Sequence, residues 1–372
     1  MKISRPRNTG ILAILALTLF SHIALSASEV VEKLPAIDFP FKNGDRVAWV
    51  GSSSTRIGIW CKTLEFLLRT RHPELKMTFA RQTTGGGTFL TGTEQLSTWL
   101  EETKPTLVLF NYGANDAAAG AAGLAKFEDN MRKCVEEAMN TGARVLLVTP
   151  QSADVRKTKA GGAEKRKLYA ETMIEYCKQK GWTILDTHHA LEALQLSAQQ
   201  DYPAYTINKD VIHLNDAAYV AWGYFLYQRM DVARESYAEI SADGKLVSMN
   251  HCKINDIKVK DGSITFTRTD QFFPFMPPIP LPPRKYVPLE SFSLYMLRIA
   301  GLPAGTYRIL CDELPVGTCT ASDLAAGVNM NTLLLNSKEV APWGSLAAEI
   351  WAGVSTEKIG STTFKFEVRK EN

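Results

Sequence analysis

The sequence lacks the patterns that mark metalloproteins and nucleotide-binding proteins. None of its six cysteines is spaced as C-x-x-C, so no zinc-type ligand pattern is present. The glycine-rich stretch at residues 85–87 is not followed by a Lys-Ser/Thr pair, which argues against a phosphate-binding loop. The chain also has no internal repeat. Zinc binding through paired cysteines and nucleotide binding through a phosphate-binding loop are therefore not expected.

The first residues of the chain carry no acidic side chain. Lys2, Arg5 and Arg7 precede an apolar run at residues 11–25, and small residues at 24–26 match the positions that signal peptidase recognises. We therefore expect residues 1–26 to be a signal peptide and the protein to be exported, to a periplasmic or extracellular location. The run is short for a membrane span, so we expect no stable span after cleavage; an uncleaved anchor is the alternative.

Little net charge remains once this leader is removed. The formal charge of the whole chain is +3, and the leader holds three positive charges and no negative ones, so the mature chain has a formal charge of zero. A nucleic-acid partner is therefore not expected. In an exported chain the cysteines permit disulfides, but several lie at apolar positions, and we interpret them as core thiols. The cysteines are Cys61, Cys134, Cys177, Cys252, Cys311 and Cys319.

Strands and helices alternate along the first part of the chain. Short apolar runs such as residues 106–110 and 143–149 are separated by segments with helical spacing, such as residues 124–140. A further strand is expected at residues 75–79. This alternation predicts an α/β fold, a three-layer α/β/α sandwich with a mostly parallel sheet of flavodoxin-like type, over residues 40–238.

The stretch at residues 45–55 is the point from which a function can be inferred. A short apolar run ends in Gly51 and three serines, which is typical of a buried strand that turns sharply into a helix and exposes Ser53. A serine hydroxyl needs a base within hydrogen-bond reach and donors for the oxyanion before it acts as a nucleophile. Both must come from elsewhere in the chain.

Three later stretches supply candidates for these roles. They are the glycines at 85–87, the Gly-Ala-Asn-Asp sequence at 113–116 and the Asp-Val-Ile-His sequence at 210–213. Each lies just after a predicted strand or just before a predicted helix, and the carboxyl ends of parallel strands share one edge of a sheet. Over residues 45–230 this pattern resembles the SGNH (GDSL-type) hydrolase family of esterases and lipases.

The resemblance implies a role for each block. Ser53 is the expected nucleophile, His213 the general base and Asp210 the residue that orients the imidazole. The backbone N–H groups of Ser53 and Gly86 and the amide of Asn115 are the expected oxyanion donors. This scheme requires no metal and no organic cofactor.

Alternatives remain at several of these positions. Ser52 stands where the family usually has aspartate, and Ser52 or Ser54 is a conceivable nucleophile. The glycines also suit a flexible loop, and Asn115 suits a turn or helix cap. His188 and His189 are rival bases, for which we expect surface or capping roles. The basic loop after Pro150 should lie at the rim of the same sheet edge, where it is either solvated or in contact with an acidic or hydroxyl-rich substrate.

Residues 239–372 have a different character. Hairpins are expected at residues 252–268 and 307–320, with a short helix at 342–352 and a final strand at 362–368, so we predict a smaller, mostly-β accessory domain. Residues 274–288 form a proline-rich segment, for which we expect an extended conformation.

The sequence therefore predicts an exported serine ester hydrolase. The resemblance favours O-acyl, in particular acetyl, esters of carbohydrates or lipids as substrates, cleaved through an acyl-enzyme. Two alternatives use the same fold: a catalytically silent glycan-binding protein and an O-acyltransferase.

Overall fold

The computed structural model describes residues 33–34, 36–230, 235–271, 294–336, 342–353 and 362–371. The predicted signal peptide at 1–26 and the proline-rich segment at 274–288 lie outside these ranges. Within them, no helix combines the length and the apolar character that a membrane crossing requires.

A five-stranded parallel sheet forms the centre of the first part of the chain. Its order is β2-β1-β3-β4-β5, which is the order of flavodoxin-like sheets. The sequence prediction of an α/β fold is confirmed. The strands are β1 (Arg46–Gly51), β2 (Thr78–Thr83), β3 (Leu107–Asn111), β4 (Arg144–Val148) and β5 (Ile184–Leu185).

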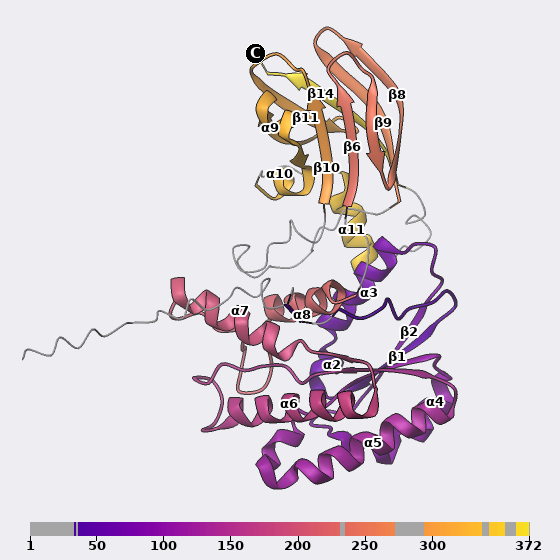
Figure 1. Ribbon diagram of the computed structural model, residues 1–372, viewed down its shortest axis with the longest axis vertical. Helices are drawn as coiled ribbons and strands as arrows, with labels where there is room; N and C mark the ends of the chain where they lie inside the picture. The colour runs from indigo at the N-terminus through magenta and orange to yellow at the C-terminus, as the bar shows by residue number, and fades with distance from the viewer. Residues whose placement is uncertain are drawn as a thin grey trace, which may run out of the picture.

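Helices cover both faces of this sheet, as Figure 1 shows. Successive side chains of β1 point to opposite faces, so Trp49 joins the core under α3, α7 and α8, whereas Val50 joins the core under α4, α5 and α6. The helices are α2 (Ser53–Ile57), α3 (Ile59–Arg71), α4 (Phe89–Thr103), α5 (Leu124–Asn140), α6 (Gly162–Lys180), α7 (His188–Asp201) and α8 (Asp216–Gln228), with the 3-10 helix η1 (Asp116–Gly123) before α5.

The second part of the chain is built mainly of strands. It begins with β6 at Glu235, close to the predicted boundary at residue 239, and forms one four-stranded and one five-stranded sheet with orders β13-β10-β6-β7 and β12-β11-β14-β9-β8. The strands are β6 (Glu235–Ser241), β7 (Leu246–Asn250), β8 (Cys252–Lys260), β9 (Ser263–Asp270), β10 (Leu294–Ala300), β11 (Thr306–Cys311), β12 (Leu314–Thr320), β13 (Val328–Asn329) and β14 (Thr362–Lys370). The short helices are α9 (Ala321–Ala326), α10 (Met330–Asn336) and α11 (Pro342–Ala352).

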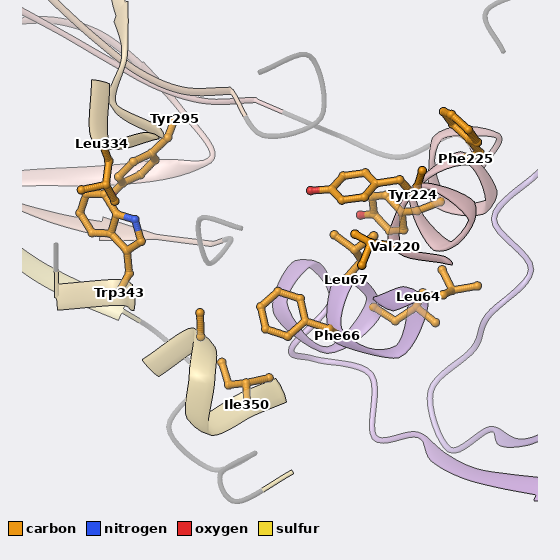
Figure 2. Close-up of a cluster of buried hydrophobic side chains, with 14 of the residues drawn as sticks. Leu64, Phe66, Leu67, Val220, Tyr224, Phe225, Tyr295, Leu334, Trp343 and Ile350 are labelled. Atoms are coloured by element: carbon orange, nitrogen blue, oxygen red, sulfur yellow. The ribbon is translucent and has the colours of Figure 1, made fainter. Parts of the chain in front are cut away.

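The two parts of the chain share one continuous apolar core. Helix α11 packs against α3, with the rings of Trp351 and Phe66 6.0 Å apart. Figure 2 shows Phe66 of α3 and Ile350 of α11 on facing helices, with Trp343 and Tyr295 on the side of the β-rich part. The β-rich second part is therefore attached to the α/β first part through buried side chains.

Most predicted elements are confirmed, and one is wrong. Residues 124–140 and 342–352 are helical as predicted, and both hairpins form. The strand predicted at residues 75–79 instead spans Thr78–Thr83, because this edge strand is defined by pairing with β1 and carries mainly polar residues after Phe79. All six cysteines are free and buried, which confirms their interpretation as core thiols.

Candidate active site

The candidate site lies at the carboxyl-terminal edge of the parallel sheet, where β1 ends and α2 begins. Gly51 closes the strand, and a Cβ at this position would overlap the Thr55 hydroxyl and lie 2.7 Å from the carbonyl oxygen of Asn111. Only glycine therefore allows β1 and β3 to approach each other at the turn. Ser53 is the first residue of α2, so its N–H has no acceptor within that helix.

The structure brings together Ser53, His213 and Asp210, the three residues predicted from the sequence to form the catalytic group. The Ser53 hydroxyl donates to Nε2 of His213 across 2.9 Å, and Nδ1 of His213 lies 2.9 Å from Oδ2 of Asp210. An ionised carboxylate only accepts hydrogen bonds, so the proton of the imidazole is on Nδ1, and Nε2 is left as the acceptor for Ser53. This is the arrangement that general-base activation of a serine requires.

The carboxylate of Asp210 is held in its ionised form. Oδ1 accepts the backbone N–H groups of Ile212 and His213 at 2.8 and 2.7 Å, while Oδ2 accepts the imidazole. Partial burial by itself would raise the pKa of Asp210, but these hydrogen bonds outweigh it and lower the pKa to about 2. The orienting group is thus charged at neutral pH.

Two side chains from elsewhere in the fold hold the loop that carries this pair. Arg166 of α6 donates to the carbonyl oxygens of Val211 and Ile212 at 2.9 and 3.4 Å. Gln151, which follows β4, donates to the carbonyl oxygen of Ile212 at 3.3 Å and to the hydroxyl of Ser54 at 3.0 Å. Both side chains are buried. No sequence motif marks Arg166 or Gln151, because the groups that they bind lie far from them along the chain.

The predicted oxyanion donors lie on neighbouring loops. The amide of Asn115 donates to the carbonyl oxygen of Gly87 at 2.9 Å, and the N–H of Gly87 donates to Thr84. The N–H of Gly86 has no acceptor within the described ranges, and the residue has a φ of +72°. Of the three glycines, Gly86 thus combines a free N–H with a backbone conformation that favours glycine, which agrees with its predicted role.

Asp116 joins the loop after β3 to the start of α4. Its carboxylate accepts the N–H of Gly113 at 2.9 Å and the N–H of Phe89 at 3.1 Å. Burial raises the pKa of this carboxyl group, and both backbone hydrogen bonds oppose the rise. The aspartate of the Gly-Ala-Asn-Asp stretch therefore positions Asn115 through the backbone and is not itself directed at Ser53.

The rival histidines occupy other environments. His188 is buried, so the surface role expected for it is wrong. Its Nδ1 forms a hydrogen bond with the carbonyl oxygen of Pro150, and burial lowers its pKa to about 4. His189 pairs with Asp186, whose Oδ2 lies 2.7 Å from its Nδ1, and this bond raises the pKa of His189. Asp186 and His189 repeat the Asp-x-x-His spacing, a signal visible in the sequence, yet neither contacts Ser53.

A cavity of about 380 Å³ borders the site at Asn115 and Ile212. Thr158, Lys159 and Lys165 also line it, together with small residues of η1 and the loop before α6. A larger cavity of about 740 Å³ lies at the opposite end of the strands, near Leu107 and Arg144. In open α/β sheets ligands bind at the carboxyl ends of the strands, so of these two cavities the smaller one lies at the edge that carries Ser53. Within the described ranges, no group of three His, Cys, Asp or Glu side chains is placed to hold a metal ion.

Known proteins resemble this chain in family pattern and in fold. Residues 50–221 match the model of the GDSL-like Lipase/Acylhydrolase family. None of the curated proteins matches the chain. Among solved structures, a gut microbial diltiazem-metabolizing enzyme is similar over 91% of this chain and 100% of its own, with a TM-score of 0.75 and 18% identity. That likeness shows a shared fold that includes the β-rich part.

Two acetylxylan esterases are similar to about half of the chain. One is an acetyl xylan esterase with 16% identity and a TM-score of 0.44, which covers 49% of this chain and 98% of its own. The other, from Geobacillus stearothermophilus, has 17% identity and a TM-score of 0.43, and covers 51% of this chain and 96% of its own.

Proposed function

We propose that this ester-bond hydrolase, whose residues 50–221 match the GDSL-like lipase/acylhydrolase family, acts through an acyl-enzyme on Ser53. The observation that carries the proposal is the unbroken chain of hydrogen bonds from Ser53 through His213 to Asp210. Ser53 Oγ attacks the ester carbonyl while Nε2 of His213 takes its proton. His213 then returns this proton to the departing alcohol, and water releases the acyl group by the same sequence of steps.

The developing oxyanion has three candidate donors in this proposal. They are the N–H groups of Ser53 and Gly86 and one N–H of the Asn115 amide. An amide has two N–H bonds, so Asn115 can keep its contact with Gly87 and still direct the second to the oxyanion. Loss of one such donor costs about 3 kcal/mol of transition-state stabilisation.

We propose small acyl groups, in particular acetyl, on carbohydrate alcohols as the substrate class. The cavity beside Asn115 is lined by small alanine and glycine residues and by polar or basic side chains, with Val211 and Ile212 as its large apolar residues. Such a lining suits a hydroxyl-rich molecule better than a long acyl chain, which binds along continuous apolar surface.

We also propose that the protein is exported after removal of residues 1–26. The basic start, the apolar run and the small residues at 24–26 support this. Sequencing of the amino terminus of the protein recovered from outside the cytoplasm tests it. A chain that stays cytoplasmic with Met1 retained contradicts it.

The catalytic proposal is tested by hydrolysis of p-nitrophenyl acetate and of longer acyl esters. Wild type is compared with Ser53→Ala and His213→Ala, after circular dichroism has shown that both variants are folded. We expect each variant to lose at least about 10³-fold in kcat, since residues of such a triad act as a unit. Variants as fast as wild type overturn the assignment of the site, and a wild type that hydrolyses no ester leaves glycan binding as the function to measure.

A further inference from the structure

The cavity beside the catalytic residues is lined by two lysines that form no ion pair within the described part of the chain. Lys159, in the loop before α6, and Lys165, in its first turn, both line it and are exposed. Neither ammonium group has a carboxylate or another hydrogen-bond partner among the described residues. Two lysines therefore line the same space as Asn115 and Ile212.

Neighbouring basic residues on the same segment behave differently. Arg156 pairs with Asp154 at 2.6 Å, and Lys167 pairs with Glu192 at 3.0 Å. Asp154, Lys167 and Glu192 of these pairs line a different cavity from the one that Lys159 and Lys165 line. The positive charge at the catalytic cavity thus belongs to Lys159 and Lys165 in particular and is not a general property of the loop.

No neighbouring carboxylate forms an ion pair with either lysine among the described residues. Asp210 accepts the imidazole of His213 and its charge acts on the Arg166 guanidinium, and Asp116 accepts two backbone N–H groups. Glu164, between the two lysines in sequence, lines the other cavity. Arg166 adds a third cation at the wall, with its guanidinium on the carbonyl groups of the catalytic loop. A bound anion would therefore meet cations on several sides of the space.

We propose that the alcohol part of the ester carries a carboxylate that Lys159 and Lys165 bind, so that the substrate is an O-acetylated acidic sugar such as a uronic acid. His213 returns its proton to the departing alcohol oxygen, and its neighbour Ile212 lines the cavity. The alcohol, not the acyl group, is thus the part of the substrate directed toward the lysines. This inference rests on the ester hydrolase function proposed above, and it adds the charge of the substrate.

The test compares two substrates acetylated at the same hydroxyl, O-acetylated glucuronic acid and O-acetylated glucose, with p-nitrophenyl acetate as the basal substrate. Lys159→Gln and Lys165→Gln should each lower kcat/KM for the acidic sugar by roughly two- to fivefold, the range expected for exposed ion pairs. Both variants should therefore reduce the preference of the enzyme for the acidic sugar over the neutral sugar, whereas Lys157→Gln should change none of the three activities. Added salt should weaken the preference of wild type for the acidic sugar.

Lys157→Gln is the matched control, because Lys157 is exposed on the same loop but does not line the cavity. Equal hydrolysis of both sugars by wild type, or a loss as large in the Lys157 variant, overturns the inference while the ester hydrolase function stands. If no ester is hydrolysed by wild type, the proposed function fails and the inference fails with it.

Discussion

Three consecutive serines have three different environments at the turn after β1. Ser53 donates to His213, while Ser54 accepts hydrogen bonds from Gln151 and from the hydroxyl of Tyr219. Ser52 is buried at the start of α2, and within the described ranges its hydroxyl makes no capping bond. Of the three, only Ser53 is in contact with the base, so Ser52 and Ser54 are not placed to act as nucleophiles.

Ser54→Ala is expected to affect stability more than chemistry. The change removes one of the hydrogen-bond partners of the buried Tyr219 hydroxyl and one of those of Gln151, so we expect the free energy of unfolding to fall by about 1–3 kcal/mol. Urea titration measures this, and ester hydrolysis should retain a large part of its rate. Ser52→Ala is the control and should change stability by less than about 1 kcal/mol, the usual range for a site without a bonded partner. Equal losses in both variants contradict the interpretation.

Asp210 is expected to make stability depend on pH in the acid range. Its pKa is lower in the folded chain, about 2, than in an unfolded chain. Such a carboxylate stabilises the fold fully above its unfolded pKa of about 4, and the contribution disappears as pH falls toward the folded value. The difference in unfolding free energy between wild type and Asp210→Asn should therefore shrink between pH 4 and 2.

Urea unfolding at several pH values measures this difference, which stays small because about half of the side chain is exposed. A difference that does not vary with pH shows that Asp210 is not held by these hydrogen bonds. At neutral pH, Asp210→Asn should also lower kcat by about 10²- to 10⁴-fold, because the imidazole loses its orienting charge.

At the scale of single elements, α6 connects the outer layer of the fold with the catalytic loop. The helix packs on the face of the sheet that α4 and α5 also cover, yet Arg166 in its second turn reaches the carbonyls of Val211 and Ile212. Burial lowers the pKa of the Arg166 guanidinium. A rigid helix thus fixes the loop that places His213 opposite Ser53.

Arg166→Met is expected to displace that loop without unfolding the domain. Two carbonyl groups lose a charged donor, and we expect kcat to fall by about 10- to 100-fold, the equivalent of roughly 1–3 kcal/mol. Arg166→Lys should recover part of the loss, because it restores a charged donor. Steady-state kinetics on p-nitrophenyl acetate measure both, and a lysine variant as poor as methionine in a folded protein would argue against positioning by charge.

At the scale of the whole molecule, the contact between α3 and α11 determines whether the chain unfolds as one unit. Phe66 is almost fully buried and meets Trp351 across the junction. We expect wild type to melt in a single calorimetric transition. Phe66→Ala should cost about 3 kcal/mol and separate the transition into two, since the removed side chain links the two parts.

Phe127→Ala is the control for this experiment. Phe127 is equally buried but belongs to the core under α4, α5 and α6, away from the junction. It should lower stability by a similar amount and keep the two parts coupled. Two transitions in the control, or one in the Phe66 variant, contradict the role given to the junction.

The fold also keeps the cysteine thiols away from solvent. All six cysteines are buried and free, and burial raises the pKa of Cys134, Cys177 and Cys319 to about 12. Thiolates are the reactive form, so native protein should not react with Ellman's reagent. Denaturation without reductant should expose all six thiols, and a smaller number would reveal disulfides.

The sequence by itself determined the order of the elements and the local chemistry of the site. The apolar spacing at residues 124–140 specifies one helix face, and the Asp210–His213 spacing brings a carboxylate to its own imidazole, because such features depend on neighbours in the chain. The sequence predicts that the edge strand β2 begins three residues before its observed start. Its pairing with β1 decides where it begins, and its polar residues give little sign of a strand.

Only the tertiary structure decided which distant residues meet. Ser53 and His213 are 160 residues apart, and their contact depends on the strand order of the sheet. The same holds for Arg166 on the catalytic loop, for Lys159 and Lys165 at the cavity, and for α11 on α3. A pattern along the chain records which side chains are buried or exposed, but the partner of each is set by how the layers pack.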